Sequence, residues 1–313
     1  MCEQQPCTVR VRSLVRLCDD RAMAVLKLPS RSSAAFAIAI AKADMIEGMA
    51  KGMAVLESFD TQRQRLNATL AAGRAGITRA AARRHLLTLT HLGYLETDGS
   101  YFWLSAKVLR FSGSYLATAR LPRAVQPELN RLAMQTQESF SVAVLDGAEV
   151  VIIGRSGMES RSFGDGPQAG ATALQRVFPR VTAYGLHLGA RLPAHATSTG
   201  RVLLAAKPKS EVSAWLKARG EAGGLTRLTL HTTTDARKLR AVIDQVRVDD
   251  YCVASEEHEL GVHALAVPLR NMQGHTVAAL NVVASPQRLG AAALRRDLLP
   301  LLLDAARALR GLL

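Results

Sequence analysis

Six arginines between Asp60 and Glu96 have the charge and spacing to bind phosphate groups, and no acidic residue lies among them. They are Arg63, Arg65, Arg74, Arg79, Arg83 and Arg84. A solvated helix face usually mixes charges of both signs, whereas a surface that binds phosphates favours one sign. The stretch therefore indicates a nucleic-acid-binding module. An ordinary helical pair with a solvated basic face is the alternative.

Two short helices joined by a tight turn would hold these arginines. Asn67 can cap the first helix, because its side-chain oxygen accepts an otherwise unpaired backbone N–H. Gly76 has the backbone freedom that a sharp turn needs, and Thr78 can cap the second helix. The buried face of the second helix is predicted from apolar residues at helical spacing, which are Ala82, Leu86, Leu89 and Leu92.

A β-hairpin is predicted directly after the second helix. Two short aromatic-rich runs lie between Tyr94 and Trp103, on either side of Asp98 and Gly99. An Asp-Gly pair between such runs favours a tight hairpin turn. The order helix, turn, helix and hairpin is typical of a winged helix-turn-helix.

The second helix of this motif is the predicted recognition helix. Arg79, Arg83 and Arg84 lie in its first half, where such helices present side chains to the major groove. We expect these three arginines to contact DNA. Thr78, at the start of this helix, is expected to add a phosphate contact. Ser100, at the tip of the wing, is expected to add another. The predicted partner is double-stranded promoter DNA.

Two further helices are predicted beside the module. Residues 46–59 carry an apolar stripe at helical spacing and should pack under the recognition helix. This stripe consists of Met49, Met53 and Leu56, with Ala50 and Val55 beside them. A helix over residues 105–119 can be capped by Ser105, and its apolar stripe is formed by Val108, Leu109 and Leu116. Such a stripe suits dimerisation, because paired DNA-binding modules read two half-sites. The alternative is that this helix only connects the two domains.

Motifs for catalysis or metal binding are not found. Residues 154–157 read Gly-Arg-Ser-Gly, one residue short of the hydrolase motif G-x-S-x-G. His258 and His263 are too far apart for the zinc motif H-E-x-x-H. Glu256, Glu257 and His258 could be a metal or acid–base cluster, but such a run is more often a solvated loop. The chain has no phosphate-binding loop and no convincing dinucleotide fingerprint, so we expect no enzyme activity, cofactor or metal.

Cysteine content and hydropathy predict a cytoplasmic protein. The chain has 4 cysteines and no C-x-x-C pair, so neither a zinc site nor a disulfide framework is indicated. No apolar run approaches the roughly 18 residues needed to cross a bilayer. The run 34–41 could be the core of a signal peptide, but it begins behind a long charged segment.

The length of 313 residues leaves room for about two domains. The net charge of +14 is spread along the chain and does not by itself locate a nucleic-acid site. Residues 1–45 lack sustained periodicity and are predicted to be a disordered extension. The alternative is that translation starts at Met45 or Met49.

The pattern from residue 121 onward predicts an α+β domain with a mostly antiparallel sheet. A hairpin over residues 141–153 turns at Asp146 and Gly147, and residues 154–180 are expected to form a loop. The predicted helices are 122–137, 195–206, 210–219, 234–248 and 289–312. The other predicted strands are 181–188, 251–255, 264–270 and 276–284.

The chain resembles the IclR family of bacterial transcription regulators over about residues 46–313. In the first domain the resemblance lies in Lys51-Gly-Met-Ala-Val-Leu56, Arg83-Arg-His-Leu-Leu-Thr-Leu89 and His91-Leu-Gly-Tyr94. In the second it lies in Gly189-Ala-Arg-Leu-Pro-Ala-His-Ala-Thr-Ser-Thr-Gly-Arg-Val-Leu-Leu-Ala205, Glu256-Glu-His-Glu-Leu-Gly261 and Ala266-Val-Pro-Leu269. The wing and linker, residues 98–110, look most similar to the PobR/PcaR branch, which responds to aromatic acids of the β-ketoadipate pathway.

This resemblance implies an α+β fold of three parts. A winged helix-turn-helix over residues 46–104 is joined by a linker helix, 105–120, to a GAF-like effector-binding and oligomerisation domain, 121–313. The family assembles as homodimers or dimers of dimers. Two features depart from the family pattern. Gly73 weakens the first helix of the motif by about 1 kcal/mol relative to alanine, and the extension 1–45 has no counterpart.

The resemblance also implies an effector pocket in the second domain. Its lining residues would be Ser198, Thr199, Ala254, Ser255, Ala264, Asn281 and Val283. A carboxylate effector needs donors, which hydroxyl groups and N–H groups at the start of a helix can provide. Arg191 or His195 could add positive charge. The alternatives are that Arg191 is a surface residue and that His195 caps or packs against its own helix.

The function implied is a ligand-responsive transcription regulator of aromatic-acid catabolism genes. The branch resemblance favours an activator that senses 4-hydroxybenzoate or protocatechuate, a small aromatic carboxylate, and that could contact RNA polymerase. One alternative is a repressor that responds to a different small carboxylate. The other is a sensing module without DNA binding. No membrane association is expected.

Overall fold

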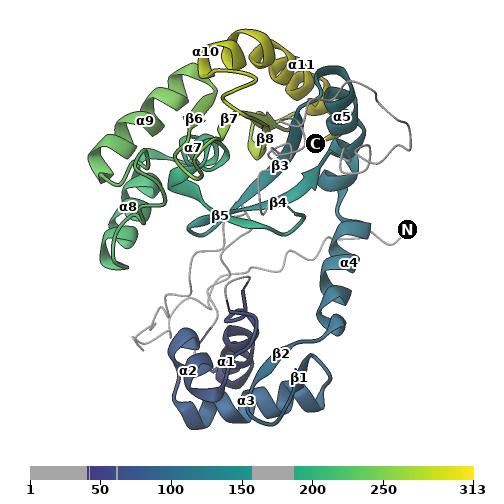
Figure 1. The fold of residues 1–313 in the computed structure, drawn as a ribbon, viewed down its shortest axis with the longest axis vertical. Coiled ribbons are helices and arrows are strands. Elements are labelled where there is room, and N and C mark those ends of the chain that lie inside the picture. Colours follow the sequence, from purple (N-terminus) through teal and green to yellow (C-terminus); the bar gives the residue numbers. More distant parts are fainter. Residues whose placement is uncertain (1–40, 42, 61–62, 157–186) are drawn as a thin grey trace, which may run out of the picture.

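The computed structural model describes residue 41 and residues 43–60, 63–156 and 187–313. These residues form a small helical body and a larger α+β body, joined by one helix (Figure 1). Most of the extension 1–45, most of the loop expected at 154–180 and most of the strand expected at 181–188 lie outside the described residues. Residues 154 and 155, which were expected to begin that loop, belong to a strand instead, because they pair with the neighbouring strand.

The small body consists of three helices and a two-stranded sheet. Its elements are α1 (Glu47–Leu56), α2 (Ala68–Ala75), α3 (Arg79–His91), β1 (Leu95–Thr97) and β2 (Phe102–Leu104). β1 and β2 are antiparallel, as the predicted hairpin requires. Val55, Leu86 and Phe102 belong to a buried core that ties α1, α3 and the hairpin together. The predicted winged helix-turn-helix is therefore confirmed as a fold.

The predicted caps and turn of this motif are confirmed. The Asn67 side chain accepts hydrogen bonds from the backbone N–H groups of Thr69 and Leu70. Thr78 accepts one from the backbone N–H of Ala81. Gly76 has φ of +65°, in the left-handed region that favours glycine.

The apolar faces of the first body are only partly as predicted. Leu92 is 49% exposed, because α3 ends at His91 and Leu92 begins the turn that follows. Met49 and Met53 are also exposed, whereas Val55 is fully buried. The core-facing side of α1 is therefore the side of Val55, and the predicted methionine stripe faces away from the core.

The linker helix is shorter than predicted. Ser105 caps a single 3-10 turn, Ala106–Val108, which continues into α4 (Leu109–Thr118). The backbone is extended at Ala119, and α5 (Arg120–Thr136) begins directly after it. Leu109, Phe111 and Tyr115 are exposed on α4. Leu109 belongs to the predicted stripe, so the described residues leave part of that stripe uncovered.

The larger body is built on an antiparallel sheet of six strands in the order β5-β4-β3-β8-β7-β6. The strands are β3 (Ser139–Asp146), β4 (Glu149–Arg155), β5 (Arg191–Pro193), β6 (Cys252–Ser255), β7 (His263–Arg270) and β8 (Thr276–Ala284). The α+β class predicted from the sequence is confirmed. The short edge strand β5 was not predicted, because its three residues owe their strand geometry to pairing with β4.

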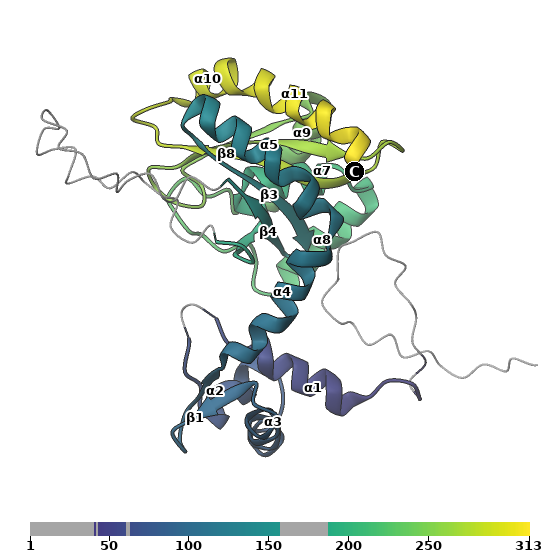
Figure 2. The ribbon, with the colours of Figure 1, turned by 90° about the vertical axis from the view of Figure 1, so that its right-hand side faces the viewer.

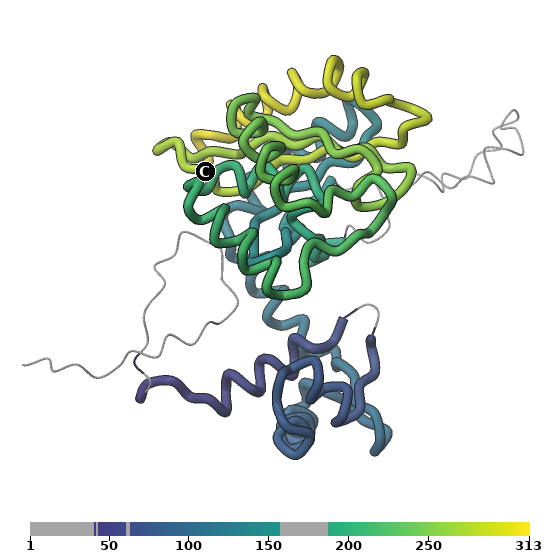
Figure 3. The backbone as a smooth tube through the Cα atoms, turned by 90° about the vertical axis from the view of Figure 1, so that its left-hand side faces the viewer, coloured from purple at the N-terminus to yellow at the C-terminus, as the bar shows by residue number. Residues whose placement is uncertain are grey.

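Two helical layers cover the two faces of this sheet. α5 and α11 (Leu299–Leu309) lie together on one face, as Figure 2 shows. On the other face lie α7 (Ser198–Ala205), α8 (Lys209–Glu221) and α9 (Ala236–Asp249), whose stretch is green in Figure 3. Each layer has its own buried core, so the inward-facing strand residues divide between two environments.

Two predicted helices are interrupted. The helix expected at 195–206 is a 3-10 turn, Ala194–Ala196, followed by α7, with Thr197 as the cap between them. The closing helix expected at 289–312 consists of α10 (Ala291–Ala293), a π-helical turn (Leu294–Leu298), α11 and a last 3-10 turn (Arg310–Leu312). Pro300 lies at the start of α11, where its missing N–H leaves the preceding turn without a regular helical bond.

Candidate functional site

The exposed face of α3 carries unpaired positive charge. Arg79, Arg83 and Arg84 are all exposed, and none has an ion pair or side-chain hydrogen bond with the part of the chain that the structure describes. By contrast, Arg74 forms an ion pair with Asp60, and Arg65 lies 4.3 Å from the centre of the Trp103 ring. The arginines predicted to contact DNA are therefore among those that the fold leaves available.

The wing is held in shape by its own aspartate. Oδ1 of Asp98 accepts hydrogen bonds from the backbone N–H groups of Ser100 and Tyr101, at 3.0 and 2.7 Å. These bonds hold the pKa of Asp98 below its ordinary value, because they stabilise the carboxylate. Ser100 is exposed at the tip of the hairpin, where a predicted phosphate contact requires it to be.

A second candidate site lies between the first turn of α7 and the sheet. Thr197 caps α7 by accepting a hydrogen bond from the N–H of Gly200. Gly200 packs so closely on the preceding 3-10 turn that a Cβ atom there would lie 2.1 Å from the carbonyl oxygen of Ala194. This contact fixes the direction in which Ser198 and Thr199 enter the domain, and both side chains are buried.

A chain of buried polar side chains runs from α7 across the sheet. The hydroxyl of Ser198 lies 3.2 Å from Oδ1 of Asn281 on β8. Nδ2 of Asn281 lies 3.4 Å from the hydroxyl of Ser141 on β3. All three residues are buried. Buried hydroxyl and amide groups can orient a small polar ligand, which is the role expected for Ser198 and Asn281.

The other predicted lining residues lie beside this chain. Ala254 on β6, Ala264 on β7 and Val283 on β8 are paired directly across three neighbouring strands. Their side chains therefore share one face of the sheet. Ser255 follows Ala254 at the end of β6 and so points to the opposite face by strand alternation. The structure thus brings most of the predicted lining together and separates Ser255 from it.

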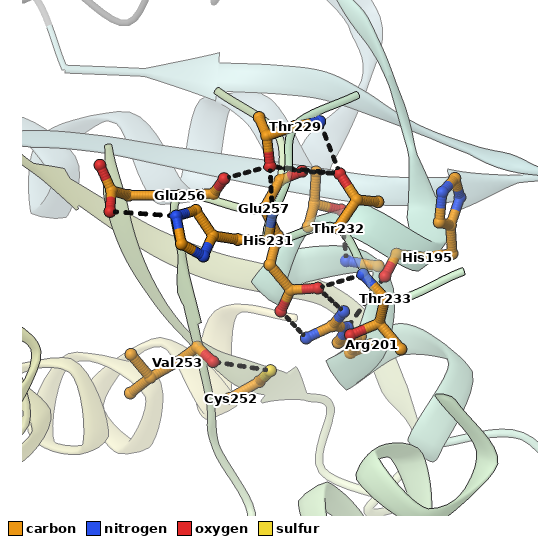
Figure 4. Close-up of polar contacts among 12 residues, drawn as sticks. His195, Arg201, Thr229, His231, Thr232, Thr233, Cys252, Val253, Glu256 and Glu257 are labelled. Atoms are coloured by element: carbon orange, nitrogen blue, oxygen red, sulfur yellow. Dashed lines mark hydrogen bonds and ion pairs between the residues drawn. The ribbon is translucent and has the colours of Figure 1, made fainter. Parts of the chain in front are cut away.

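Arg201 and Glu257 form a buried ion pair that sequence reasoning did not identify. The guanidinium of Arg201 donates to both carboxylate oxygens of Glu257 at 2.5 Å, and its Nε donates to the carbonyl of His195 at 2.9 Å (Figure 4). Burial raises the pKa of Glu257, but the bonds and charge of Arg201 outweigh this and leave the pKa below its ordinary value. The sequence did offer one signal for this ion pair. Arg201 lies three positions after Ser198, so the two residues share one side of the helix.

This ion pair joins α7 to two loops. The backbone N–H of Thr233 donates to Glu257 Oε2 at 2.9 Å, and the hydroxyl of Thr232 donates to the Glu257 carbonyl (Figure 4). The hydroxyl of Thr229 donates to the carbonyl of Glu256. The run at 256–258 was expected to be either a metal or acid–base cluster or a solvated loop with one member holding it in place. Glu257 holds the loop in this way, and the run is partly buried.

His195 is buried beside the start of α7, whereas Arg191 is not. Nε2 of His195 lies 2.9 Å from the carbonyl oxygen of Thr226, so Nε2 carries the proton and Nδ1 is an acceptor in the neutral ring. Burial lowers the pKa of His195, and the charge of Arg201 adds to this effect. Arg191 is exposed on β5 and forms ion pairs with Asp146 and Glu149 at 2.8 and 2.7 Å. The structure therefore does not bring Arg191 together with the other predicted residues.

The described residues offer neither a cluster of metal-ligating side chains nor a helix that could cross a membrane. Among the described residues, no three His, Cys, Asp or Glu side chains gather as a metal site would require. None of the helices in the described ranges has the length and apolar character needed to cross a membrane.

Comparison with known proteins finds similarity over most of the chain. The model of the IclR helix-turn-helix domain matches residues 48–99, and that of the bacterial transcriptional regulator IclR C-terminal matches residues 171–310. The Pca operon regulatory protein of Acinetobacter baylyi is 48% identical over 86% of this chain and 90% of its own length. The p-hydroxybenzoate hydroxylase transcriptional activator of the same organism is 48% identical over 86% of this chain and 92% of its own.

A solved structure matches the second body. It is a double mutant of the PobR transcription factor inducer-binding domain from Acinetobacter, in complex with 3-hydroxybenzoic acid. It is 43% identical, covers 61% of this chain and 98% of its own, and aligns with a TM-score of 0.51. The similarity therefore extends to both bodies of the chain.

Proposed function

Because the chain belongs to the IclR family of bacterial transcriptional regulators, we propose that it activates genes of aromatic-acid catabolism when it binds a hydroxybenzoate. The family and the similar proteins are DNA-binding regulators and not enzymes. The observation that carries the choice of effector is the 48% identity to both a Pca operon regulator and a p-hydroxybenzoate hydroxylase activator. The effector is 4-hydroxybenzoate or protocatechuate.

The proposed effector site is the space between the first turn of α7 and the inner face of β6, β7 and β8. The buried hydroxyl groups of Ser198 and Thr199 and the amide of Asn281 supply hydrogen bonds. The small side chains of Ala254 and Ala264 suit a flat ring. The pocket is closed by Val283 and by His195, and Ser255 lies outside it because it faces the other side of the sheet.

The proposed DNA site is the exposed face of α3 with the wing. Arg79, Arg83 and Arg84 reach base edges or phosphates in the major groove, and Thr78 and Ser100 contact phosphates. Residues 46–104 bind DNA and residues 105–120 link this part to the effector-binding and oligomerisation part, 121–313.

We also propose that the regulator works as a homodimer or dimer of dimers in the cytoplasm. Exposed apolar side chains on α1 and α4 favour self-association, since monomers seldom expose neighbouring large apolar groups without use. These are Met49, Met53, Leu109, Phe111 and Tyr115. As an activator, the DNA-bound protein contacts RNA polymerase.

Replacement of Arg83 by alanine is expected to weaken specific DNA binding by roughly 1–3 kcal/mol, because a bidentate arginine contact to a base is worth that much. Anisotropy titrations with operator and random DNA measure the effect. The matched control is Arg296→Ala, an exposed arginine of the second body that pairs with Asp297. An equal loss on both DNAs would mean that Arg83 contacts phosphate instead of a base.

Replacement of Asn281 by leucine is expected to weaken hydroxybenzoate binding by about 1 kcal/mol or more, because the buried amide bonds both Ser198 and Ser141. Calorimetric titration of the full chain measures the change, and operator binding without ligand should stay the same. The control is Asn130→Leu, because Asn130 lies on α5, the helix that covers the opposite face of the sheet. Unchanged affinity in Asn281→Leu would place the effector elsewhere.

The proposed function as a whole is tested by anisotropy on a labelled fragment from upstream of the gene, with and without each acid. Salt-sensitive binding that resists competitor DNA and changes with one acid supports the proposal and identifies the effector. If the protein binds the DNA but neither acid changes this binding, the protein is still a regulator, but these two acids are excluded as its effectors. A folded protein that binds no DNA under these conditions contradicts the proposed regulation of its own neighbouring genes.

A further inference from the structure

We propose that Ser139, the first residue of β3, binds the ring hydroxyl of the effector. The inference rests on the proposed function and names the side chain that recognises this hydroxyl within the proposed site. Sequence reasoning did not select Ser139, because the predicted hairpin begins at residue 141. In the structure β3 begins two residues earlier, at Ser139.

The register of the sheet places Ser139 in the row of residues that lines the proposed site. Ser139 is paired directly opposite Val283 on β8, and Val283 is paired opposite Ala264 on β7. Ala264 is in turn paired opposite Ala254 on β6. Residues directly opposite each other in an antiparallel sheet share a face, with Cβ atoms about 4.5–5.5 Å apart. The Ser139 side chain therefore starts on the face that carries these three apolar lining residues.

This face of the sheet is the one that α7 covers. Ala143 on β3 and Val283 on β8 both belong to the buried core beneath α7. Ser139 and Ala143 are four positions apart, and β3 pairs with β8 without a register shift between them, so both side chains point to the same side. Phe140, by contrast, belongs to the core on the opposite face. Ser139 consequently lies on the side of α7.

The hydroxyl of Ser139 is available for a ligand. Ser139 is half-buried, and its hydroxyl has no hydrogen bond with any residue that the structure describes. The hydroxyl groups of Ser141 and Ser198, by contrast, both bond the side chain of Asn281. A serine hydroxyl can donate one hydrogen bond and accept two. Ser139 can therefore accept a hydrogen bond from a ring hydroxyl or donate one to it.

The start of β3 is held firmly enough to position a ligand. The chain turns from α5 into β3 at Gln137, where φ is +60°. The N–H of Phe140 donates to the Ser156 hydroxyl at 3.1 Å, and the carbonyl of Phe140 accepts from the N–H of Ser156 at 2.9 Å. On its other side Phe140 is paired with Val282 on β8. A binding residue on a strand held on both sides keeps its geometry better than one on a loop.

This placement also orients the ligand. Asn281 is two residues from Val283 along β8, so Ser139 and Asn281 are diagonal neighbours, about 7–8 Å apart. A benzene ring with a polar group at each end can span this distance.

The first turn of α7 lies at the Asn281 end of this diagonal. Ser198 bonds Asn281 there, and the hydroxyl of Thr199 has no hydrogen bond with the described residues. Hydroxyl groups and N–H groups at the start of a helix suit a carboxylate. The carboxylate of the effector therefore lies at the start of α7, and the ring directs its hydroxyl toward Ser139.

The test compares acids with and without the ring hydroxyl on the full chain. Calorimetry measures the Kd of 4-hydroxybenzoate, protocatechuate and benzoate for wild type, Ser139→Ala and Ser139→Thr. Wild type should prefer the two hydroxylated acids. Ser139→Ala should weaken the binding of both about 3- to 10-fold and leave benzoate nearly unchanged, because only the ring hydroxyl loses a partner. Threonine should restore the preference, since it keeps the hydroxyl and is favoured in strands.

The control variant is Ser213→Ala. Ser213 lies on α8, and its hydroxyl donates to the carbonyl of Lys209 within that helix. This substitution also removes a serine hydroxyl from the second body, but it should leave the Kd of all three acids unchanged.

The outcomes separate this inference from the proposed function. If wild type binds a hydroxybenzoate and Ser139→Ala binds it equally well, the inference is overturned, while the proposed effector stands. An equal loss on benzoate and 4-hydroxybenzoate also overturns it, because Ser139 would then not distinguish the ring hydroxyl. If wild type binds none of the acids, the effector class is wrong and the inference falls with it. Should Ser139→Ala fail to fold, wild type still decides, because equal affinity for benzoate and 4-hydroxybenzoate would leave no role for a hydroxyl-binding residue.

Discussion

Replacement of Gly200 by alanine is expected to destabilise the second body by about 3 kcal/mol or more and to abolish effector binding. The new Cβ would lie 2.1, 2.3 and 2.6 Å from the carbonyl oxygen, Cα and carbonyl carbon of Ala194. All three are backbone atoms, which cannot turn aside as the end of a flexible side chain can. Overpacking a core typically costs 1–3 kcal/mol, and a clash with backbone belongs at or above the upper end of that range.

The effect on binding follows from the position of the clash. α7 must move away from the 3-10 turn that precedes it, and Ser198 and Thr199 lie in the first turn of α7. A displacement there breaks the hydrogen bond between Ser198 and Asn281. Urea unfolding gives the stability change, and calorimetry with 4-hydroxybenzoate gives the binding change.

Gly73 offers a matched control for this substitution. It lies inside α2, and a Cβ atom there would meet nothing within 4 Å. Gly73→Ala is therefore expected to stabilise the first body by about 1 kcal/mol, the ordinary difference between the two residues in a helix. A Gly200→Ala protein as stable as wild type would show that the 3-10 turn can shift without cost.

Features that depend on nearby residues were predictable from the sequence. A cap needs a short polar side chain beside the first free N–H groups, which is why Asn67 and Thr78 could be identified. The hairpin at Asp98 follows from the same kind of local chemistry. The polar residues around α7, by contrast, came from the family resemblance and not from spacing.

Features that depend on tertiary contacts were not predictable in this way. Helical periodicity finds an apolar stripe but does not say which neighbour covers it, so Met49 and Met53 were assigned to the core although they are exposed. Arg201 and Glu257 are 56 positions apart and meet only because α7 packs over the end of β6.

Replacement of Glu257 by glutamine is the second change with a large expected effect. Arg201 is 2% exposed, so loss of the carboxylate leaves a buried guanidinium without a compensating charge. Breaking a buried ion pair on one side typically costs 3–5 kcal/mol. The loops at 229–233 and 256–258 should loosen as well, because Glu257 also accepts from the backbone N–H of Thr233.

The pH dependence of stability provides an independent signature. The folded state holds the pKa of Glu257 below its ordinary value. The carboxylate therefore contributes its full stabilisation above the unfolded-state pKa of about 4.3, and this contribution is lost as the pH falls through the lower folded-state pKa. Urea unfolding from pH 7 to pH 3 should show this loss in wild type and a correspondingly smaller one in Glu257→Gln.

A double variant separates the cost of an unpaired charge from the net value of the pair. Arg201→Met combined with Glu257→Gln removes both charges and keeps similar volumes, so it should regain much of the stability that either single change loses. A double variant that is as unstable as the sum of the two single losses would mean that Arg201 and Glu257 stabilise the fold independently. The double variant could also regain stability but not hydroxybenzoate binding. This result would mean that Arg201 and Glu257 position α7 over the sheet, because the protein would then fold with the first turn of α7 displaced.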